Sequence, residues 1–586
     1  MLESTPTRPE LRGTFGMVSS THWIASAVGM RALERGGNAF DAAVAAALVL
    51  QVIEPHMNGP AGDLSLLFWS EELGEARVLC GQGVAPRAAT IRAFGDLGLN
   101  AVPGTGLLAA CVPGAFDAWM LLLRDFGRLG VRDAFEPAIH YAGGGFPAAP
   151  LMCQRIAEME ATFRELWPSS RDHYLATGVP APHSQFRNRP LAQTFTRIVR
   201  DAESAGPSRE AQVDAARDAF YRGSIAEIIV GFSSGTSVVD SSGSGHSGLL
   251  SLDDLASWRA SYERPVTGDY RGMTVCKTGP WGQGPVFLQQ LALLDGFALN
   301  ELPLDSADRI HTIVECAKLA FADREAWYGD PDHVDVPLEA LLSSDYNAAR
   351  RPLVGDRASL ELIPGSPDGR SPSIAVPGRE TPAPGTREPT LTTGDTCYVA
   401  VVDRDGNVVS ATPSGGWLQS SPVMPSLGFP LGTRAQMFSL VEGAANALVP
   451  GARPRTTLSP TLVLRDGRPV LAFGTPGGDQ QDQWTVGFFL AHIDCGLDLQ
   501  AAIDLPAFHT THFPDSFYPH EARPGEIHVE ARVGESVISE LRSRGHTVEV
   551  EPAWGLGRLG AVGRDESGVL SAGANPRGKS GYAVGR

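Results

Sequence analysis

Apolar residues recur at helical spacing in three stretches of the chain. Residues 22–35 predict a helix that ends at 36–38, because glycine and asparagine are typical C-terminal stops. Residues 41–53 are apolar almost all round, so a second helix is predicted to lie inside the protein. A third helix is predicted to begin after Ser306, a good N-cap, and to end before the turn at 329–331.

Towards the C-terminus the spacing becomes that of β-strands. Apolar runs at 398–403 and 408–412 flank a polar turn, and runs at 461–465 and 470–473 flank an Asp-Gly turn. Each pair predicts a β-hairpin. The apolar stretch at 484–493, which follows the second pair, is interpreted as a helix.

The segment before the first hairpin fits neither pattern. Ten of the 25 residues from 365 to 389 are proline or glycine, a density that disfavours helix and sheet alike. We interpret it as a flexible surface segment. It leads into Gly-Asp-Thr at 394–396 and then directly into the apolar run that begins at Cys397.

Composition and charge exclude several classes of partner. The 586 residues are 43% hydrophobic and 19% charged, as in an ordinary folded protein. The net charge is −18 and no long basic run is present, so we expect no nucleic acid or anionic membrane as a partner. The most apolar stretch, 39–53, carries Asp41 and is shorter than the roughly 20 residues of a membrane span.

The cysteines and histidines indicate neither a disulfide framework nor a metal site. The seven cysteines are scattered and form no CxxC pair. His509 and His512 lack the companion ligands of a zinc site, so no metal is expected. The amino terminus lacks the pattern of a secretory signal, and with the scattered thiols this favours a cytoplasmic location.

Thr396 lies where the loose segment meets the apolar run. A threonine hydroxyl is a weak nucleophile, but the first residue of a chain can use its own α-amine as the base. That amine titrates near roughly 7.7–8.0, so a sizeable fraction is unprotonated at neutral pH. Cleavage between Asp395 and Thr396 would therefore create the catalyst. The alternative is an ordinary loop that enters a strand.

Several segments, in a fixed order, resemble the gamma-glutamyltransferase (gamma-glutamyltranspeptidase) family of N-terminal nucleophile hydrolases. They are "ALERGGNAFDAAVAAALVLQVIEPHMNG" (32–59), "VPGAFDAW" (112–119), "AKLAFADREAWYGDPDHVDVP" (317–337), "GDTCYVAVVDRDGNVVSATPS" (394–414), "RPRTTLSPTLVLRDG" (453–467) and "GTPGGD" (474–479). The resemblance implies a precursor that cleaves itself between Asp395 and Thr396 and works without a metal or other cofactor.

The resemblance also implies how the chain is organised. A large part, residues 1–395, would end in the strap at 365–395, and a small part, residues 396–586, would begin with the nucleophile. Both parts would build one αββα sandwich, an α+β fold with two stacked antiparallel sheets between helical layers. The cut is therefore expected inside a single fold, and each part is the other's partner.

Five further residues receive roles through the resemblance. Ser414 would hydrogen-bond the nucleophile, although it could be an ordinary turn serine. Gly477 and Gly478 would form the oxyanion hole, because glycine lets backbone N–H groups approach an anion, although a Pro-Gly-Gly turn is often only a turn. Thr456 and Thr457 would contact the carboxylate end of the substrate.

The sequence departs from the family where glutathione is recognised. Gln82 stands where these enzymes hold an Arg for the γ-glutamyl carboxylate, and a neutral amide cannot form that charged fork. Residues 431–440 offer Arg434 where an acidic residue for the amino group is expected. A cation there suits an acyl group that has a carboxylate but no ammonium, such as a dicarboxylic or oxo-acid group.

Three functions are consistent with these residues. The first is a self-processing hydrolase or acyltransferase that forms an acyl-enzyme on Thr396 with a small-molecule substrate. The second is a relative from secondary metabolism that hydrolyses a carbon–carbon bond next to a carbonyl in a small antibiotic precursor. The third is a binding protein that is never cut. A cut one residue later would instead expose the thiol of Cys397.

Overall fold

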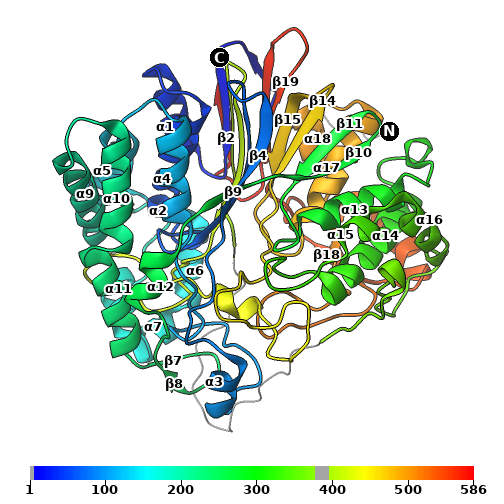
Figure 1. Ribbon diagram of the computed structural model, residues 1–586. Coiled ribbons are helices and arrows are strands. Elements are labelled where there is room, and N and C mark those ends of the chain that lie inside the picture. The colour runs from blue at the N-terminus through cyan, green and yellow to red at the C-terminus, as the bar shows by residue number, and fades with distance from the viewer. Residues whose placement is uncertain (1–5, 376–394) are drawn as a thin grey trace.

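Two stacked β-sheets form the centre of the molecule. The computed structural model describes residues 6–375 and 395–586. Each central sheet has seven strands, all paired antiparallel among the described residues. Helices cover the outer face of each sheet (Figure 1). This four-layer arrangement confirms the αββα fold class.

Both central sheets combine strands from before and after residue 395. The β12 sheet has the order β21 (Tyr582–Gly585), β2 (Gly16–Ser20), β12 (Val399–Asp403), β13 (Val408–Ser414), β3 (Asp63–Ser70), β4 (Glu75–Gly81) and β9 (Ser261–Glu263). The β15 sheet has the order β1 (Leu11–Gly13), β20 (Leu570–Ala574), β19 (Gly560–Arg564), β15 (Arg468–Gly474), β14 (Thr461–Arg465), β11 (Met273–Lys277) and β10 (Val266–Tyr270). The predicted hairpins are confirmed as β12–β13 and β14–β15.

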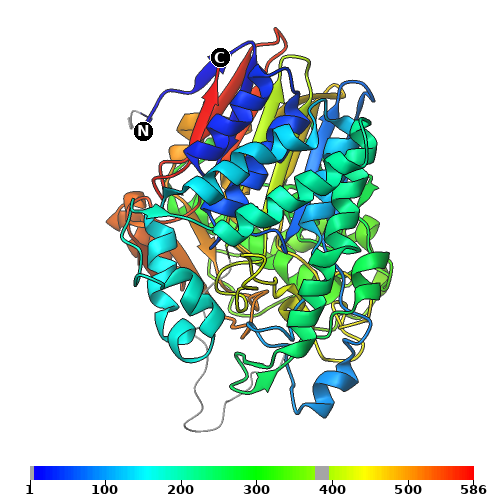
Figure 2. The ribbon, with the colours of Figure 1, turned by 90° about the vertical axis from the view of Figure 1, so that its left-hand side faces the viewer.

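The helices divide into two layers. The main helices over the β12 sheet are α1 (Trp23–Glu34), α2 (Ala39–Ile53), α4 (Ala115–Phe126), α5 (Val131–Gly144), α9 (Arg189–Ser204) and α10 (Arg209–Tyr221). In Figure 2 this blue-to-green layer lies in front of the sheets. The main helices over the β15 sheet are α13 (Gly284–Leu294), α14 (Ala307–Trp327), α17 (Gln481–Cys495) and α18 (Leu499–Asp504).

Smaller elements surround these layers. The helices are α3 (Ile91–Asp96), α6 (Pro150–Glu158), α7 (Glu160–Glu165), α8 (Pro168–Tyr174), α11 (Ser224–Gly235), α12 (Leu252–Ser257), α15 (Leu338–Leu342), α16 (Ser344–Arg350) and α19 (Glu535–Ser543). The strands are β5 (Phe146–Pro147), β6 (Gln185–Phe186), β7 (Val238–Val239), β8 (Gly245–His246), β16 (Phe508–Thr510), β17 (Glu526–Glu530) and β18 (Thr547–Glu551).

The helices predicted from the apolar spacing are present, with the expected ends. His22 caps α1, whose C-terminal stop includes Gly36 at a φ of +91°. Every residue of α2 is buried, as its all-round apolar pattern predicted. Ser306 caps α14 by accepting a hydrogen bond from a backbone N–H in the first turn. The stretch at 484–493 lies within α17.

Side-chain alternation along the strands fills three core layers. Val399 and Val401 face the helices α1, α2 and α4. Ala400 and Val402 point the other way and pack against residues of the β15 sheet. On its outer face the β15 sheet packs against phenylalanines of α13 and α17. Strand β12, directly behind Thr396, is therefore buried on both faces.

Part of the predicted flexible segment lies outside the described residues, which omit 376–394. Within residues 6–375 and 395–586, no helix is both long and apolar enough to cross a membrane.

Candidate functional site

The β12 sheet brings several of the predicted site residues to one edge. Thr396 forms a β-bridge with Ser414, the last residue of β13. Ser414 is in register with Asp63, the first residue of β3. Strand β3 also pairs with β4, where Leu64 is in register with Gly81. Gln82, the residue after Gly81, therefore lies at the same edge of the sheet. Thr396 itself is only 3% exposed in this uncut chain.

Two hydrogen bonds converge on the carbonyl oxygen of Asp395, in the bond that is predicted to be cut. Ser414 Oγ donates to Asp395 O at 2.8 Å, and Trp417 Nε1 donates to the same oxygen at 2.7 Å. Thr396 Oγ1 donates to Ser414 Oγ at 3.2 Å. A continuous chain of hydrogen bonds therefore runs from the hydroxyl of Thr396 through Ser414 to the Asp395 carbonyl.

Trp417 was missed by sequence reasoning. It follows the glycines of the turn "PSGG", and an indole in a turn is no signal for chemistry by itself. Its N–H also donates to Met57 O at 2.9 Å, so it is shared between two carbonyls. Only the folded arrangement reveals that this indole reaches the Asp395 carbonyl.

The side-chain carboxylate of Asp395 also makes polar contacts. Its Oδ1 accepts the backbone N–H of Thr396 at 2.8 Å. Its Oδ2 is paired with the guanidinium of Arg558, which precedes β19. The backbone N–H of Arg558 in turn donates to Thr475 Oγ1 at 3.0 Å, next to the Pro-Gly-Gly turn. Sequence reasoning missed Arg558 too, because no motif surrounds it.

Cys397 is engaged in other contacts. Its thiol donates to Glu54 Oε2 at 3.2 Å and accepts from Asn58 Nδ2 at 3.1 Å. Burial, and then the carboxylate of Glu54, raise the pKa of the Cys397 thiol well above its usual range. The thiol is therefore protonated at neutral pH, which disfavours it as the nucleophile.

The Gly477–Gly478 pair lies between β15 and α17, as predicted. Gly477 has a φ of +119°, which an L side chain rarely adopts, and a Cβ there would lie 2.7 Å from the Trp484 ring. A Cβ on Gly478 would lie 2.9 Å from the Phe517 ring, and Phe517 contacts Trp417 at 5.9 Å between ring centres. Neither backbone N–H donates to any described residue.

Arg434 lies beside the site but already has a carboxylate partner. Its Nε is 2.5 Å from Asp63 Oδ2, and both residues are buried. Its guanidinium also stacks over Trp417 at 5.2 Å. Burial raises the pKa of Asp63, and the charge of Arg434 opposes that shift. The cation of Arg434 is thus balanced within the fold.

The remaining predicted residues are buried, and among the described residues none of them forms a hydrogen bond with Thr396. The amide of Gln82 has no hydrogen-bond partner there and lines a cavity of about 340 Å³ that also contains Arg453. The backbone N–H of Thr456 donates to Trp281 O at 2.9 Å. The hydroxyl of Thr457 is buried without a partner in the described part of the chain.

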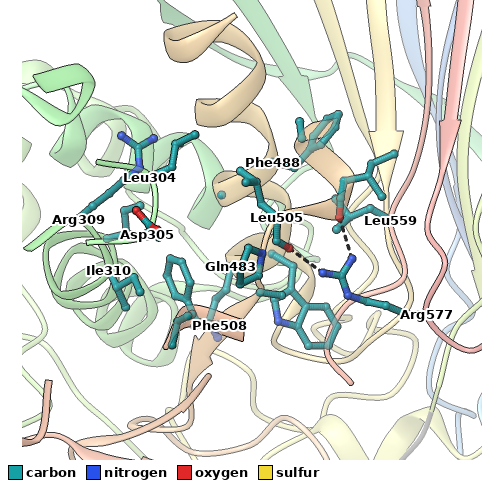
Figure 3. Close-up of a pocket in the computed structure, with 18 residues that line it drawn as sticks. Leu304, Asp305, Arg309, Ile310, Gln483, Phe488, Leu505, Phe508, Leu559 and Arg577 are labelled. Carbon is teal, nitrogen blue, oxygen red and sulfur yellow. Dashed lines mark hydrogen bonds between the residues drawn. The ribbon is translucent and has the colours of Figure 1, made fainter. Parts of the chain in front are cut away.

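A cavity adjoins the Trp417 side of the site, whereas the pocket in Figure 3 lies elsewhere. The cavity measures about 260 Å³ and is lined by Trp417, Thr433, Gln436 and Phe517 among others. The pocket in Figure 3 measures about 50 Å³, lies near α14, α17 and α18, and is lined by none of the predicted site residues. The Trp417 cavity is therefore the better placed for a substrate.

One group of described residues has the donor types of a metal site. The ligand atoms of His311, Glu315 and His546 lie within 4.8 Å of one another. His311 Nδ1 and His546 Nε2 are hydrogen-bonded at 2.8 Å, and Lys318 Nζ binds Glu315 at 2.6 Å. These contacts tie α14 to the segment that carries His546, although His546 Nδ1 is buried without a hydrogen-bond partner among the described residues.

Comparison with known proteins gives a consistent assignment. The Gamma-glutamyltranspeptidase family model matches residues 25–585. The Glutathione hydrolase-like YwrD proenzyme of Bacillus subtilis is 32% identical over 578 residues, 98% of this chain and 99% of that protein. The Oxamate amidohydrolase proenzyme of Klebsiella pneumoniae is 32% identical over 585 residues, 98% of each. The solved structure of LmbA2991HD is 55% identical with a TM-score of 0.94 and 100% coverage of both chains.

Proposed function

Because the chain belongs to the gamma-glutamyltranspeptidase family of N-terminal nucleophile hydrolases, we propose that Thr396 is its nucleophile and that self-cleavage after Asp395 makes the mature enzyme. The protein is an enzyme, a self-processing hydrolase or acyltransferase. The observation that carries the proposal is the hydrogen-bond chain from Thr396 Oγ1 through Ser414 Oγ to the Asp395 carbonyl.

The self-cleavage step follows from this chain. Thr396 Oγ1 attacks the Asp395 carbonyl carbon and passes its proton to Ser414 Oγ, which gives its own proton to the carbonyl oxygen. Trp417 Nε1 stabilises the charge that develops on that oxygen. The C–N bond then breaks, and Thr396 N takes the proton. This step frees the α-amine of Thr396 and leaves the Asp395 acyl group on Thr396 Oγ1 as an ester. Water then hydrolyses the ester, which frees the Thr396 hydroxyl and leaves Asp395 with a new α-carboxylate.

The mature enzyme would use the new amine as its base. The amine removes the proton of Thr396 Oγ1, the hydroxyl attacks the substrate carbonyl, and an acyl-enzyme forms that water or an amine resolves. Gly477 and Gly478 would stabilise the oxyanion of this second reaction, since their N–H groups donate to no described residue. The roles of Thr456 and Thr457 in substrate binding stay predictions.

The acyl group of the substrate is expected to differ from γ-glutamyl. Gln82 supplies no charge for an α-carboxylate, and Arg434 is already paired with Asp63. Loss of a charge-assisted contact costs roughly 1.5 to 3 kcal/mol, or about ten- to more than a hundredfold. Glutathione is therefore expected to be a poor substrate of this enzyme.

Denaturing gel electrophoresis of freshly made protein tests the central proposal. Two bands are expected, and amino-terminal sequencing of the smaller one should begin at Thr396, because Cys397 is protonated and engaged with Glu54. A single full-length band in protein that turns over substrate would contradict the proposal. A small fragment that begins at Cys397 would assign the nucleophile to the thiol.

Trp417→Phe is expected to slow self-cleavage by about 100-fold, because it removes one donor to the scissile carbonyl while keeping an aromatic ring. The measurement is the time course of fragment formation on a gel, with thermal melting as a check on folding. Trp281→Phe is the matched control, because Trp281 is a buried tryptophan whose N–H donates to Glu263. Equal cleavage rates in the two variants would remove Trp417 from the reaction.

A further inference from the structure

Arg558 is paired with a carboxylate that self-cleavage places at a new chain end. In the uncut chain its guanidinium binds the side chain of Asp395, whose carbonyl is the one to be cut. We infer that, in the mature enzyme, Arg558 binds a carboxylate on the acyl group of the substrate, in the place that Asp395 holds before the cut. This inference rests on the proposed function, since it requires that the bond after Asp395 is cut.

Arg558 differs in this respect from the other buried arginines near the site. Arg434 is paired with Asp63, Arg453 with Asp330, and Arg577 with Glu530. Each of those carboxylates belongs to a strand, helix or turn that the cut leaves in place. The partner of Arg558 is the residue at the cut itself, so departure of the new C-terminus removes it.

Asp395 is the one carboxylate that forms an ion pair with Arg558 among the described residues. Glu54 is the nearest candidate, but its carboxyl accepts hydrogen bonds from Thr21 Oγ1 at 2.6 Å and from the Cys397 thiol. Burial raises the pKa of Glu54, while its hydrogen bonds and the charge of Arg558 oppose that shift, and Glu54 forms no hydrogen bond with Arg558 among the described residues. A cation without a partner in such surroundings is a strong site for an anion.

The place that Asp395 vacates has the dimensions of a short acyl group. Asp395 spans its carbonyl, at Ser414 and Trp417, and its carboxylate, at Arg558, with only two carbon atoms between them. An acyl group with a carboxylate close to the reacting carbonyl can place that carboxylate on Arg558, while Gly477 and Gly478 receive its carbonyl oxygen as proposed above. The relative named for oxamate acts on a compound of this chemical class, in which carboxylate and amide carbonyl are adjacent.

Part of the Arg558 side chain is exposed to solvent. The side chain of Arg558 is 23% exposed, unlike that of Arg434 at 3%. It lines a narrow opening together with Met57, Leu151 and Ser580. The opening measures about 10 Å³ while Asp395 is in place, so an acyl group would reach this guanidinium only where Asp395 leaves.

The test compares two amides on purified two-chain enzyme, one with a succinyl group and one with a butyryl group of the same leaving amine. We expect the wild type to prefer the succinyl compound by at least about 10-fold in kcat/KM. In Arg558→Gln the preference should fall to about one, because the KM for the succinyl compound rises towards that for the butyryl compound. Arg564→Gln, at the far end of β19, is the control and should keep the preference.

The outcomes separate this inference from the proposed function. A wild type that turns over both amides equally, or an Arg558→Gln enzyme that keeps the preference, overturns the inference and leaves Thr396 as nucleophile. Failure of the wild type on both amides counts against the proposed function instead. If Arg558→Gln stays uncut, a second experiment tests the inference by measuring how strongly succinate and succinamide inhibit hydrolysis of the butyryl amide by the wild type. Succinate should then compete at least about 10-fold better than succinamide, and equal inhibition overturns the inference.

Discussion

Thr396→Ala is expected to leave one uncut chain and to abolish turnover. The variant lacks the oxygen that attacks the Asp395 carbonyl, so neither the first bond nor the free amine can form. The fold should be kept, because Thr396 lies at a sheet edge and its hydroxyl makes one hydrogen bond, to Ser414. Gel electrophoresis after prolonged incubation, together with an assay of amide hydrolysis, measures both effects.

Two further variants make this result specific. Thr396→Ser keeps a hydroxyl and should still be cut, because the attacking oxygen and its Ser414 partner remain. Cys397→Ala should also be cut, since the Cys397 thiol bonds Glu54 and Asn58 instead of the scissile carbonyl. Fragment formation in Thr396→Ala at the wild-type rate would refute Thr396 as the nucleophile.

Ser414→Ala has the second largest expected effect, a self-cleavage rate at least about 100-fold lower than that of the wild type. This change removes both the acceptor for the Thr396 proton and one of the two donors to the Asp395 carbonyl. Fragment formation over time measures the rate, and circular dichroism with thermal melting shows whether the variant is folded.

The same strand provides the control for Ser414. Ser410 is also a buried serine of β13, but its hydroxyl bonds Tyr398 and not the cleavage site. Ser410→Ala should therefore be cut at close to the wild-type rate. Ser414→Thr should recover most of the activity, because it restores a hydroxyl at the same position. Equal slowing in Ser410→Ala and Ser414→Ala would point to packing instead of chemistry.

Local spacing predicted the framework of the fold. The apolar run of β12 and the helical spacing along α2 and α14 are properties of a few consecutive residues, and burial follows them directly. The N-caps Ser306 and His22, and the glycine that follows Arg35, are local features too. The ends of these helices were therefore predictable within a few residues. The layering of the sheets came from the family resemblance, since pairing between distant strands has no local signal.

The sequence by itself determined Thr396, Ser414 and the Gly477–Gly478 turn as candidates, because each lies in a segment that resembles the family. Only the tertiary structure decided which side chains surround the bond after Asp395. Trp417 and Arg558 are 141 positions apart in the sequence, and Asp63 is further still from Arg434. Their contacts form near the start of β3, the end of β13 and the start of β19. Ion pairs depend on distance in space and not on separation along the chain, so only the folded structure shows that Asp63 pairs with Arg434 and Asp395 with Arg558.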